Sequence, residues 1–190
     1  MFHKILYNNI KSRVCVLAAL CGCFLTAAYC PAQGQPNFPV PDGNPNQLFY
    51  LQRTPNANTV VYELNYINGN LDEAHPIHVF WIRYGEQGQK AELSSVQRNF
   101  AYGIKTVPVE KDVYEISFLS YRKYVMQLKK GVDNKYYVFT TVNGKPAILK
   151  KIYLEVDGGP FWSPNVKYAE LTAVDPDTNK QVFERINIKS

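Results

Sequence analysis

Residues 77–84 read IHVFWIRY, and this stretch decides the fold. Side chains of an extended strand alternate between two faces, so the odd-numbered residues lie on one face and the even-numbered ones on the other. Both faces are largely apolar here, whereas an antiparallel strand with one solvated face alternates apolar and polar residues. The stretch therefore predicts a strand that packs on both sides, in part against a short helix.

Aromatic and β-branched runs of the same kind recur along the chain, separated by turn residues. Asn68-Gly69 and Asn143-Gly144 are strong turn signals, because both residue types tolerate a positive φ angle. The runs predict strands at residues 48–53, 59–67, 77–84, 114–121, 124–129, 136–142, 147–156, 166–174 and 182–188.

One segment interrupts this pattern. Residues 94–97 read SSVQ, a capping box in which the first Ser side chain accepts a hydrogen bond from the Gln97 amide. Gly103 can supply the positive-φ residue that ends a helix. We expect one short helix with Gln97, Arg98 and Tyr102 on its more exposed side. Its apolar face would comprise Leu93, Val96 and Phe100.

Closely spaced strands without helical crossovers predict antiparallel pairing, because a parallel return needs a connection of a dozen or more residues. The predicted fold is therefore all-β, an antiparallel meander that forms a closed or nearly closed, lipocalin-like barrel with one short helix. A two-layer β-sandwich fits the same strand count and remains the alternative.

The N-terminal residues are typical of an export signal. Lys4, Lys11 and Arg13 precede an uncharged stretch at residues 14–31, whose apolar part is shorter than the roughly 20 residues of a membrane span. We predict a signal peptide at residues 1–32, a Pro-rich extended arm at 33–47 and a single β-rich domain at 48–190. The mature chain is expected to be periplasmic or extracellular, without a transmembrane span.

Cysteine use and charge agree with this prediction. All four cysteines lie in the leader, so its cleavage after residue 32 excludes a disulfide framework in the mature chain, and lipid anchoring at Cys23 is the alternative. The leader holds three of the 21 basic residues and none of the 16 acidic ones, which leaves 18 against 16, a net charge of +2. So small a net charge does not predict nucleic-acid binding, which typically requires a strongly basic surface.

Four blocks in order carry a resemblance to a known family. They are residues 48–53 (LFYLQR), 76–84 (PIHVFWIRY), 96–103 (VQRNFAYG) and 157–164 (DGGPFWSP). Together they resemble the exported bacterial family catalogued as domain of unknown function 4833. The resemblance covers residues 48–188 and implies an envelope setting, and it brings no catalytic or binding residue with it.

No metal or cofactor site is predicted. His75 and His78 are three apart, so they face opposite sides of a strand, and His75 precedes a proline. Residues 175–179 (DPDTN) begin like a calcium loop, but Lys180 stands where glycine is needed and Ile186 where a bidentate glutamate is needed. The segment is interpreted as a hairpin turn with Asn179 at positive φ.

Arg83 and several aromatic residues are the candidate ligand-binding residues. An arginine within a two-sided strand needs a partner, either an ion pair with Glu170 or Glu184 or the anion of a ligand. Loop aromatics can stack on a sugar, or they can close the end of the fold over its core. The candidate set is Arg83, Trp81, Trp162, Phe161, Tyr102 and Arg98.

These observations favour a non-catalytic binding or interaction module of the cell envelope, with a glycan, a lipid or another envelope protein as partner. The mature chain has no nucleophile elbow, no Gly-rich phosphate loop and no cysteine nucleophile. One alternative is an envelope hydrolase that acts on carbohydrate through paired carboxylates such as Glu63, Glu170 or Glu184. A structural partner of an envelope assembly is the other alternative.

Overall fold

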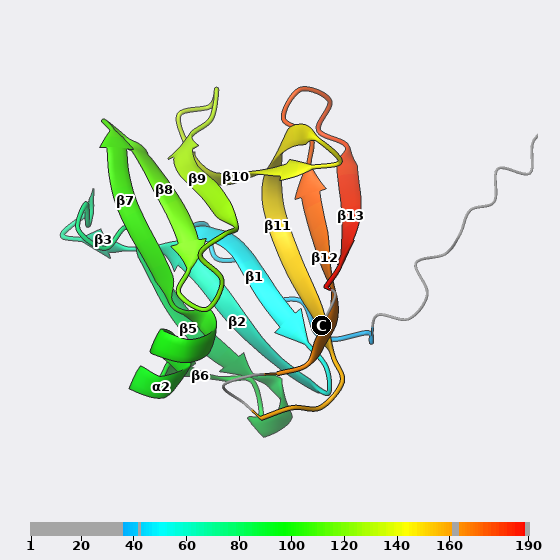
Figure 1. Cartoon of the computed structure of the whole chain (residues 1–190). Helices are drawn as coiled ribbons and strands as arrows, with labels where there is room; N and C mark the ends of the chain where they lie inside the picture. Colours follow the sequence, from blue (N-terminus) through cyan, green and yellow to red (C-terminus); the bar gives the residue numbers. More distant parts are fainter. Residues whose placement is uncertain (1–35, 42, 161–163, 189–190) are drawn as a thin grey trace, which may run out of the picture. The chain divides into compact units, whose positions relative to one another are not determined.

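The computed structural model describes residues 36–41, 43–160 and 164–188, which form one β-rich unit (Figure 1). None of the helices in these ranges is long and apolar enough to span a membrane. The helical segments are η1 (Tyr84–Glu86), α2 (Ser95–Gln97) and η2 (Arg98–Tyr102). The strands are β1 (Gln47–Arg53), β2 (Asn56–Leu64), β3 (Tyr66–Ile67), β4 (Asn70–Leu71), β5 (Ile77–Arg83), β6 (Gln89–Glu92), β7 (Ile104–Glu110), β8 (Val113–Phe118), β9 (Val125–Lys130), β10 (Tyr136–Val142), β11 (Lys145–Val156), β12 (Val166–Val174) and β13 (Gln181–Asn187).

Eleven strands form a single curled sheet, and β3 and β4 form a separate small hairpin. Two branches of this sheet, β6-β5-β2-β1 and β7-β8-β9-β10, both end at β11. On its other side β11 pairs with β12, which in turn pairs with β13. The sheet wraps through 232°, so it is an open, barrel-like half-barrel. The predicted all-β, barrel-like fold with one short helix is confirmed.

One strand pair departs from the expected meander. β1 pairs with β11 in parallel, with Tyr50 opposite Lys151 and Arg53 opposite Leu154, and every other pair in the sheet is antiparallel. The long connection that a parallel pair requires is present, because the chain completes β2 to β10 between these two strands. The prediction of antiparallel pairing throughout was therefore wrong at this one join.

The two branches share one edge of β11. The first part of this 12-residue strand, up to Ile148, pairs with β10, and the part from Lys151 pairs with β1. β12 pairs along the opposite edge, with a register shift between Leu149 and Lys151. β10 in turn leaves β11 at Phe139 to pair with β9. The branches therefore diverge at Lys150, and we call this place the fork.

The helical connection lies between the two end strands of the branches, β6 and β7, each of which pairs with a single neighbour (Figure 1). Tyr102 at its end is only 4% exposed, with its ring centroid 5.4 Å from that of Trp81. The Tyr62 hydroxyl donates to the Tyr102 carbonyl at 3.0 Å, and the Trp81 indole donates to the Gln97 side chain at 3.2 Å. The expectation that Tyr102 is exposed was wrong.

The reason lies in the helix geometry. The predicted capping box is present, with the Ser94 side chain accepting from the Gln97 amide, but the α-helical part spans only Ser95–Gln97. A π-helical turn follows, closed by a hydrogen bond from Gly103 N to Arg98 O. This wider turn rotates the phase of the side chains, so that Tyr102 points inward. Of the three residues expected on the apolar face, Leu93 is buried, but Val96 and Phe100 are 52% and 59% exposed.

Gly103 is needed for a different reason from the one predicted. Its φ angle is −62°, so it is not a positive-φ cap. A Cβ atom at this position would lie 2.0 Å from the carbonyl oxygen of Arg98. Close approach of the backbone inside the π-helical turn therefore demands glycine.

The main core fills the concave side of the sheet. Phe49 and Tyr62 stack at 4.3 Å between ring centroids, and Phe118 meets both edge-on. A second, smaller cluster lies on the other face of β2 and β5, where Val61, Phe80 and Ile82 are buried. The prediction that residues 77–84 pack on both sides is confirmed.

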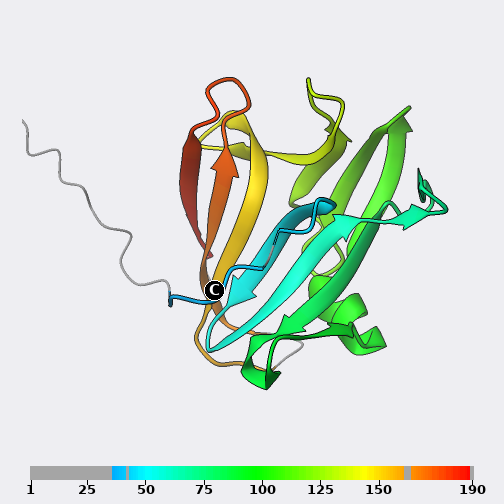
Figure 2. The same ribbon diagram turned by 180° about the vertical axis from the view of Figure 1, so that it is seen from behind.

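The Pro-rich segment before β1 docks on the outer face of the sheet. Gln52 donates from its side chain to the Pro39 carbonyl at 2.8 Å, Pro41 is buried, and Leu64 N donates to Asn46 O at 2.8 Å. Figure 2 shows this segment in blue, running back along β1. The described residues before β1 are therefore tied to β1 and β2 by these hydrogen bonds.

Replacement of Tyr62 by Phe tests the link between β2 and the helical connection. The change leaves the buried ring in place but removes the donor to the Tyr102 carbonyl, so we expect a loss of about 1–2 kcal/mol in the free energy of unfolding. Urea denaturation measures it. Tyr121→Phe, at a residue that is 59% exposed, is the control and should change stability by less than about 0.5 kcal/mol. Equal effects of the two variants would contradict this account.

Replacement of Gln52 by Ala tests the docked segment. The side chain is 1% exposed and also donates to Thr59 Oγ1 at 3.0 Å, so its loss should cost about 1–2 kcal/mol. Limited proteolysis should then cut within residues 36–46 faster than in the parent chain. Gln181→Ala, at an exposed position of β13, should leave the cleavage rate unchanged. An unchanged rate for Gln52→Ala would show that the segment does not depend on this contact.

Candidate functional site

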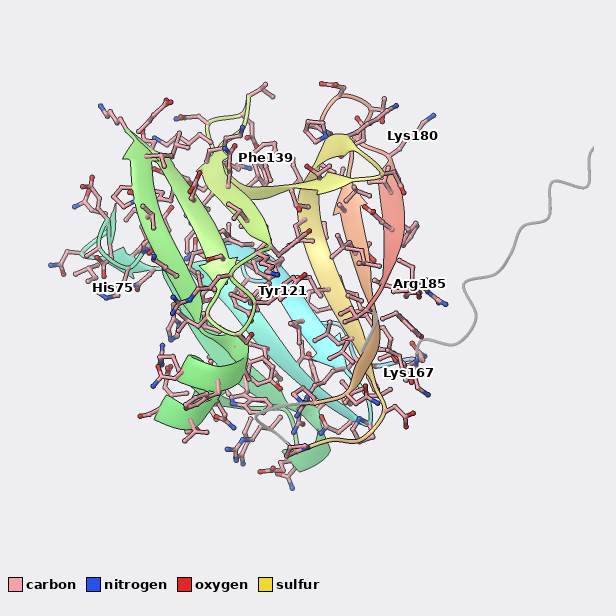
Figure 3. All side chains as sticks on the ribbon, viewed as in Figure 1. His75, Tyr121, Phe139, Lys167, Lys180 and Arg185 are labelled. Carbon is pink, nitrogen blue, oxygen red and sulfur yellow. The ribbon has the colours of Figure 1, made fainter. Side chains whose placement is uncertain are left out.

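A cavity of about 790 Å³ opens at the fork. It lies where β10 leaves β11, and Phe139, labelled in Figure 3, marks the point at which β10 changes partner. The segment before β1, the β3–β4 hairpin and the turn between β7 and β8 contribute the remaining walls. The lining residues are Pro45, Asn46, Gln47, Leu64, Tyr66, Gly69, Asn70, Leu71, Glu73, Asp112, Tyr114, Lys130, Asn134, Lys135, Tyr136, Tyr137 and Lys150. We call it the fork cavity.

Asp112 anchors one wall of the fork cavity. Its carboxylate accepts from the Tyr136 hydroxyl at 2.6 Å and from Lys130 Nζ at 2.9 Å. These hydrogen bonds hold the pKa of Asp112 below its usual value, while burial and the bond to Asp112 raise the pKa of Tyr136. At neutral pH the carboxyl group is therefore ionised and the phenol protonated, so neither group is poised to exchange a proton.

Two lysines of the fork cavity lie over tyrosine rings. Lys130 Nζ is 5.2 Å from the centroid of the Tyr136 ring, and Lys150 Nζ is 5.2 Å from that of Tyr137. Tyr137 is itself held by its hydroxyl, which donates to Asp133 at 2.7 Å. Such cation–π contacts fix the direction of a long, flexible side chain. The two ammonium groups are thus positioned rather than free to move in solvent.

Lys150 differs from Lys130 in its electrostatic surroundings. It is half-buried, and burial lowers the pKa of its ammonium group while the charge of Asp133 opposes the change. Lys130 has Asp112 as an ion-pair partner, but within the described part of the chain no carboxylate lies within 4.0 Å of Lys150 Nζ. Of the two lysines, Lys150 is therefore the one without a carboxylate at ion-pair distance among the described residues, and the charge of Asp133 acts on it from farther away.

A second, smaller hollow of about 200 Å³ surrounds His78 on the outer face of β2, β5 and β6. The two ring nitrogens face two different carboxylates, Glu63 at 3.0 Å and Glu92 at 2.9 Å. Glu63 also accepts from the Asn44 side chain, and Glu92 pairs with Arg98 at 3.6 Å. This chain of contacts connects the segment before β1 to the helical connection.

Metal binding finds no support in this geometry. His75 lies away from His78 and pairs with Asp72 at 3.9 Å, and its side chain is 81% exposed (Figure 3). Among the described residues no group of three His, Cys, Asp or Glu side chains is arranged to hold a metal ion. Residues 175–179 form a turn in which Asn179 has φ 54°, as predicted, and Asp175 accepts from two backbone amides.

The four described members of the predicted ligand-binding set are Trp81, Arg83, Arg98 and Tyr102. Trp81 and Tyr102 lie together beneath the helical connection, whereas Arg98 lies at the surface beside Glu92. Arg83 pairs with Glu86 at 3.1 Å and is 40% exposed, because it ends β5 instead of lying within it. None of these residues lines the fork cavity. Phe161 and Trp162 lie outside the described residues, and ligand binding at the whole set stays a prediction.

The carboxylates proposed for a hydrolase lie apart and have other partners. Glu170 on β12 accepts from Arg185, labelled in Figure 3, and Glu184 on β13 accepts from the Asn143 amide at 2.7 Å. Glu63 has His78 between it and Glu92. The structure therefore does not bring the three carboxylates of that hypothesis together.

Sequence reasoning missed the residues of the fork cavity. One signal was present: Lys150-Lys151 interrupts the alternation of an otherwise apolar strand, which is typical of a bulge. A bulge re-aims a side chain, and here it places Lys150 at the fork. The parallel pairing of β1 with β11, which makes Lys150 part of the cavity wall, cannot be recognised from the local sequence.

Comparison with known proteins gives a family. A profile described as Domain of unknown function (DUF4833) matches residues 49–185. The chain belongs to this family. No curated protein and no solved structure matches it. The DUF4833 match includes Asp112, Tyr136 and Lys150, and also the His78 cluster, which consists of His78, Glu63 and Glu92. Both hollows therefore lie mainly within the family domain, and residues 36–46 precede it.

The His78 cluster predicts a pH dependence of stability. Burial by itself would lower the His78 pKa from 6.5, but the hydrogen bonds and charges of Glu63 and Glu92 outweigh it and raise the pKa. A raised pKa in the folded state stabilises the fold fully below pH 6.5, and this contribution is lost as the pH rises through the folded-state pKa. The contribution of His78 to the free energy of unfolding should therefore be larger at pH 5.5 than at pH 8.5. Urea unfolding at the two pH values measures this difference, which should shrink in His78→Gln. His75→Gln, at an exposed residue, should keep it, and an unshrunken difference in His78→Gln would refute the assignment.

Proposed function

We propose that this DUF4833 protein is a non-catalytic binding module of the cell envelope, and that it takes a small saccharide in the fork cavity. The observation that carries the proposal is the cavity itself. Its volume of about 790 Å³ falls within the range of typical ligand sites, and it lies at the open end of a curled sheet, where barrel-like folds commonly bind ligands. The export signal predicted at residues 1–32 and the cysteine-free domain support the envelope setting.

The lining favours a hydroxylated ligand over a lipid chain. Apart from Pro45, Leu64, Gly69 and Leu71, every lining residue carries a polar side chain. An acyl chain would remove these groups from water without offering hydrogen bonds, which costs free energy for each group left unpaired. A sugar offers hydroxyl groups to the amides and ammonium groups, and a weakly polar face to tyrosine rings such as Tyr66 and Tyr114.

The same lining favours binding over hydrolysis. A glycosidase needs one carboxylic acid that is protonated near neutral pH beside a second, ionised carboxylate. In the fork cavity, hydrogen bonds from Tyr136 and Lys130 hold the carboxylate of Asp112 in its ionised form. The cavity thus offers hydrogen-bonding and charged groups to a bound sugar.

A panel of saccharides tests this proposal. Glucose, N-acetylglucosamine, glucuronic acid and glucose 6-phosphate are titrated into the isotopically labelled chain while amide chemical shifts are recorded. We expect at least one sugar to give saturable shifts centred on residues 69–73, 112–114 and 134–137. Asn70→Trp, which places an indole in the cavity wall, should abolish them. Asn187→Trp, the same change at an exposed position of β13, should not.

Two outcomes would refute saccharide binding at the fork. One is the absence of saturable shifts for every sugar of the panel. The other is a set of shifts that persists unchanged in Asn70→Trp, because binding would then occur elsewhere on the surface.

A further inference from the structure

We infer that the saccharide bound at the fork carries an anionic group, a carboxylate or a phosphate, and that the ammonium group of Lys150 binds this group. The inference rests on the proposed function and specifies its ligand. It follows from three observations on the described residues: the position of Lys150, its lack of a carboxylate partner, and the way neighbouring groups fix its side chain.

Backbone topology sets the position of Lys150. β10 pairs with β11 up to Ile148 and β1 pairs from Lys151, so Lys150 lies between the two partners of that edge. The register shift against β12 falls at the same residue. The side chain consequently lines the fork cavity, although both neighbours along the strand, Leu149 and Lys151, lie outside its lining.

Lys150 is partly buried without a carboxylate at ion-pair distance among the described residues, although the charge of Asp133 acts on it. Two lysines of the described residues have a carboxylate close by: Lys130 Nζ lies 2.9 Å from Asp112, and Lys167 Nζ lies 2.8 Å from Asp157. Lys150 is half-buried and has no such partner among the residues that the structure describes. Partial burial of an unpaired ammonium group is unfavourable, and an anion at the fork would remove that cost.

The ammonium group is also held in place before any ligand binds. The Tyr137 ring lies 5.2 Å from Lys150 Nζ, and the hydrogen bond from Tyr137 to Asp133 fixes that ring. A side chain that is already ordered loses less conformational entropy on binding than a free lysine does. Such ordering favours binding of an anion by Lys150, because less conformational entropy is lost when the complex forms.

The remaining charges of the fork cavity give the ligand a direction. Lys130 and Asp112 neutralise each other, Lys135 on the turn before β10 adds a second positive charge to the cavity wall, and the negative charge of Asp133 acts on Lys150. Glu73, which follows the β3–β4 hairpin in the chain, adds a carboxylate to the cavity wall. An acidic sugar would therefore place its anion toward Lys150 and its hydroxyl groups toward the hairpin.

Calorimetric titration of matched sugars tests the inference. Glucose, glucuronic acid and glucose 6-phosphate share a ring and differ in charge, and inorganic phosphate and acetate supply the anions alone. We expect both acidic sugars to bind the parent chain at least about tenfold more tightly than glucose, because a charge-assisted hydrogen bond is involved. Each anion alone should bind more weakly than its sugar, and comparison of the two acidic sugars shows whether carboxylate or phosphate is preferred.

Substitution at Lys150 assigns the effect. Lys150→Gln should weaken both acidic sugars about tenfold and leave glucose unchanged, and Lys150→Arg, which keeps the charge, should retain most of the preference. Lys129→Gln is the matched control, because Lys129 also lies over an aromatic ring, 4.8 Å from the Phe139 centroid, but does not line the fork cavity. Thermal unfolding of each variant shows that the fold is intact.

The possible failures are distinguishable. Equal affinity for glucose and the acidic sugars, or an unchanged preference in Lys150→Gln, would overturn the inference and leave saccharide binding at the fork standing. Inorganic phosphate or acetate that binds as tightly as the matching sugar would also overturn it, since the sugar would then contribute nothing. Absence of binding by all three sugars would refute the proposed function, and the inference with it.

Discussion

The structure depends on one constraint: each position along the edge of a strand can pair with only one neighbour. β11 is long enough to accept two strands on the same edge, β10 along its first part and β1 along its second. That shared edge joins two branches that lie far apart in the sequence into one curled sheet. Because β1 and β10 cannot both pair at Lys150, they diverge there, and the fork cavity is the space that results.

The opposite side of the half-barrel obeys a related constraint. β6 and β7 have no partner beyond their neighbours within the branches, and the chain places its helical connection between them (Figure 1). The π-helical turn directs Tyr102 inward, where it contacts Trp81 and accepts a hydrogen bond from Tyr62. Trp81 and Tyr102, which the sequence analysis named as candidate ligand contacts, therefore pack against each other here. The polar cavity lies elsewhere, at the fork.

Two edge strands, β6 and β7, were not predicted from the sequence, whereas the edge strand β13 was. β6 spans Gln89–Glu92, whose side chains are mostly polar, and β7 contains Pro108, which lacks a backbone donor. Both have the composition expected of edge strands, where charge and proline discourage pairing with other chains, and neither shows the apolar alternation on which strand prediction relies. By contrast, residues 136–142 and 166–174 were predicted with the bounds that β10 and β12 have.

The sequence by itself determined the local features of this protein: the two-sided packing of residues 77–84, the positive φ angles at Asn68 and Asn143, and the capping box at Ser94. Only the tertiary structure decided that Tyr102 is buried, that Arg83 pairs with Glu86 and that Lys150 lines the fork cavity. The physical reason is the range of the interactions involved. Alternation, turns and caps are set by residues within a few positions of one another, whereas the parallel pairing of β1 with β11 joins residues about a hundred positions apart.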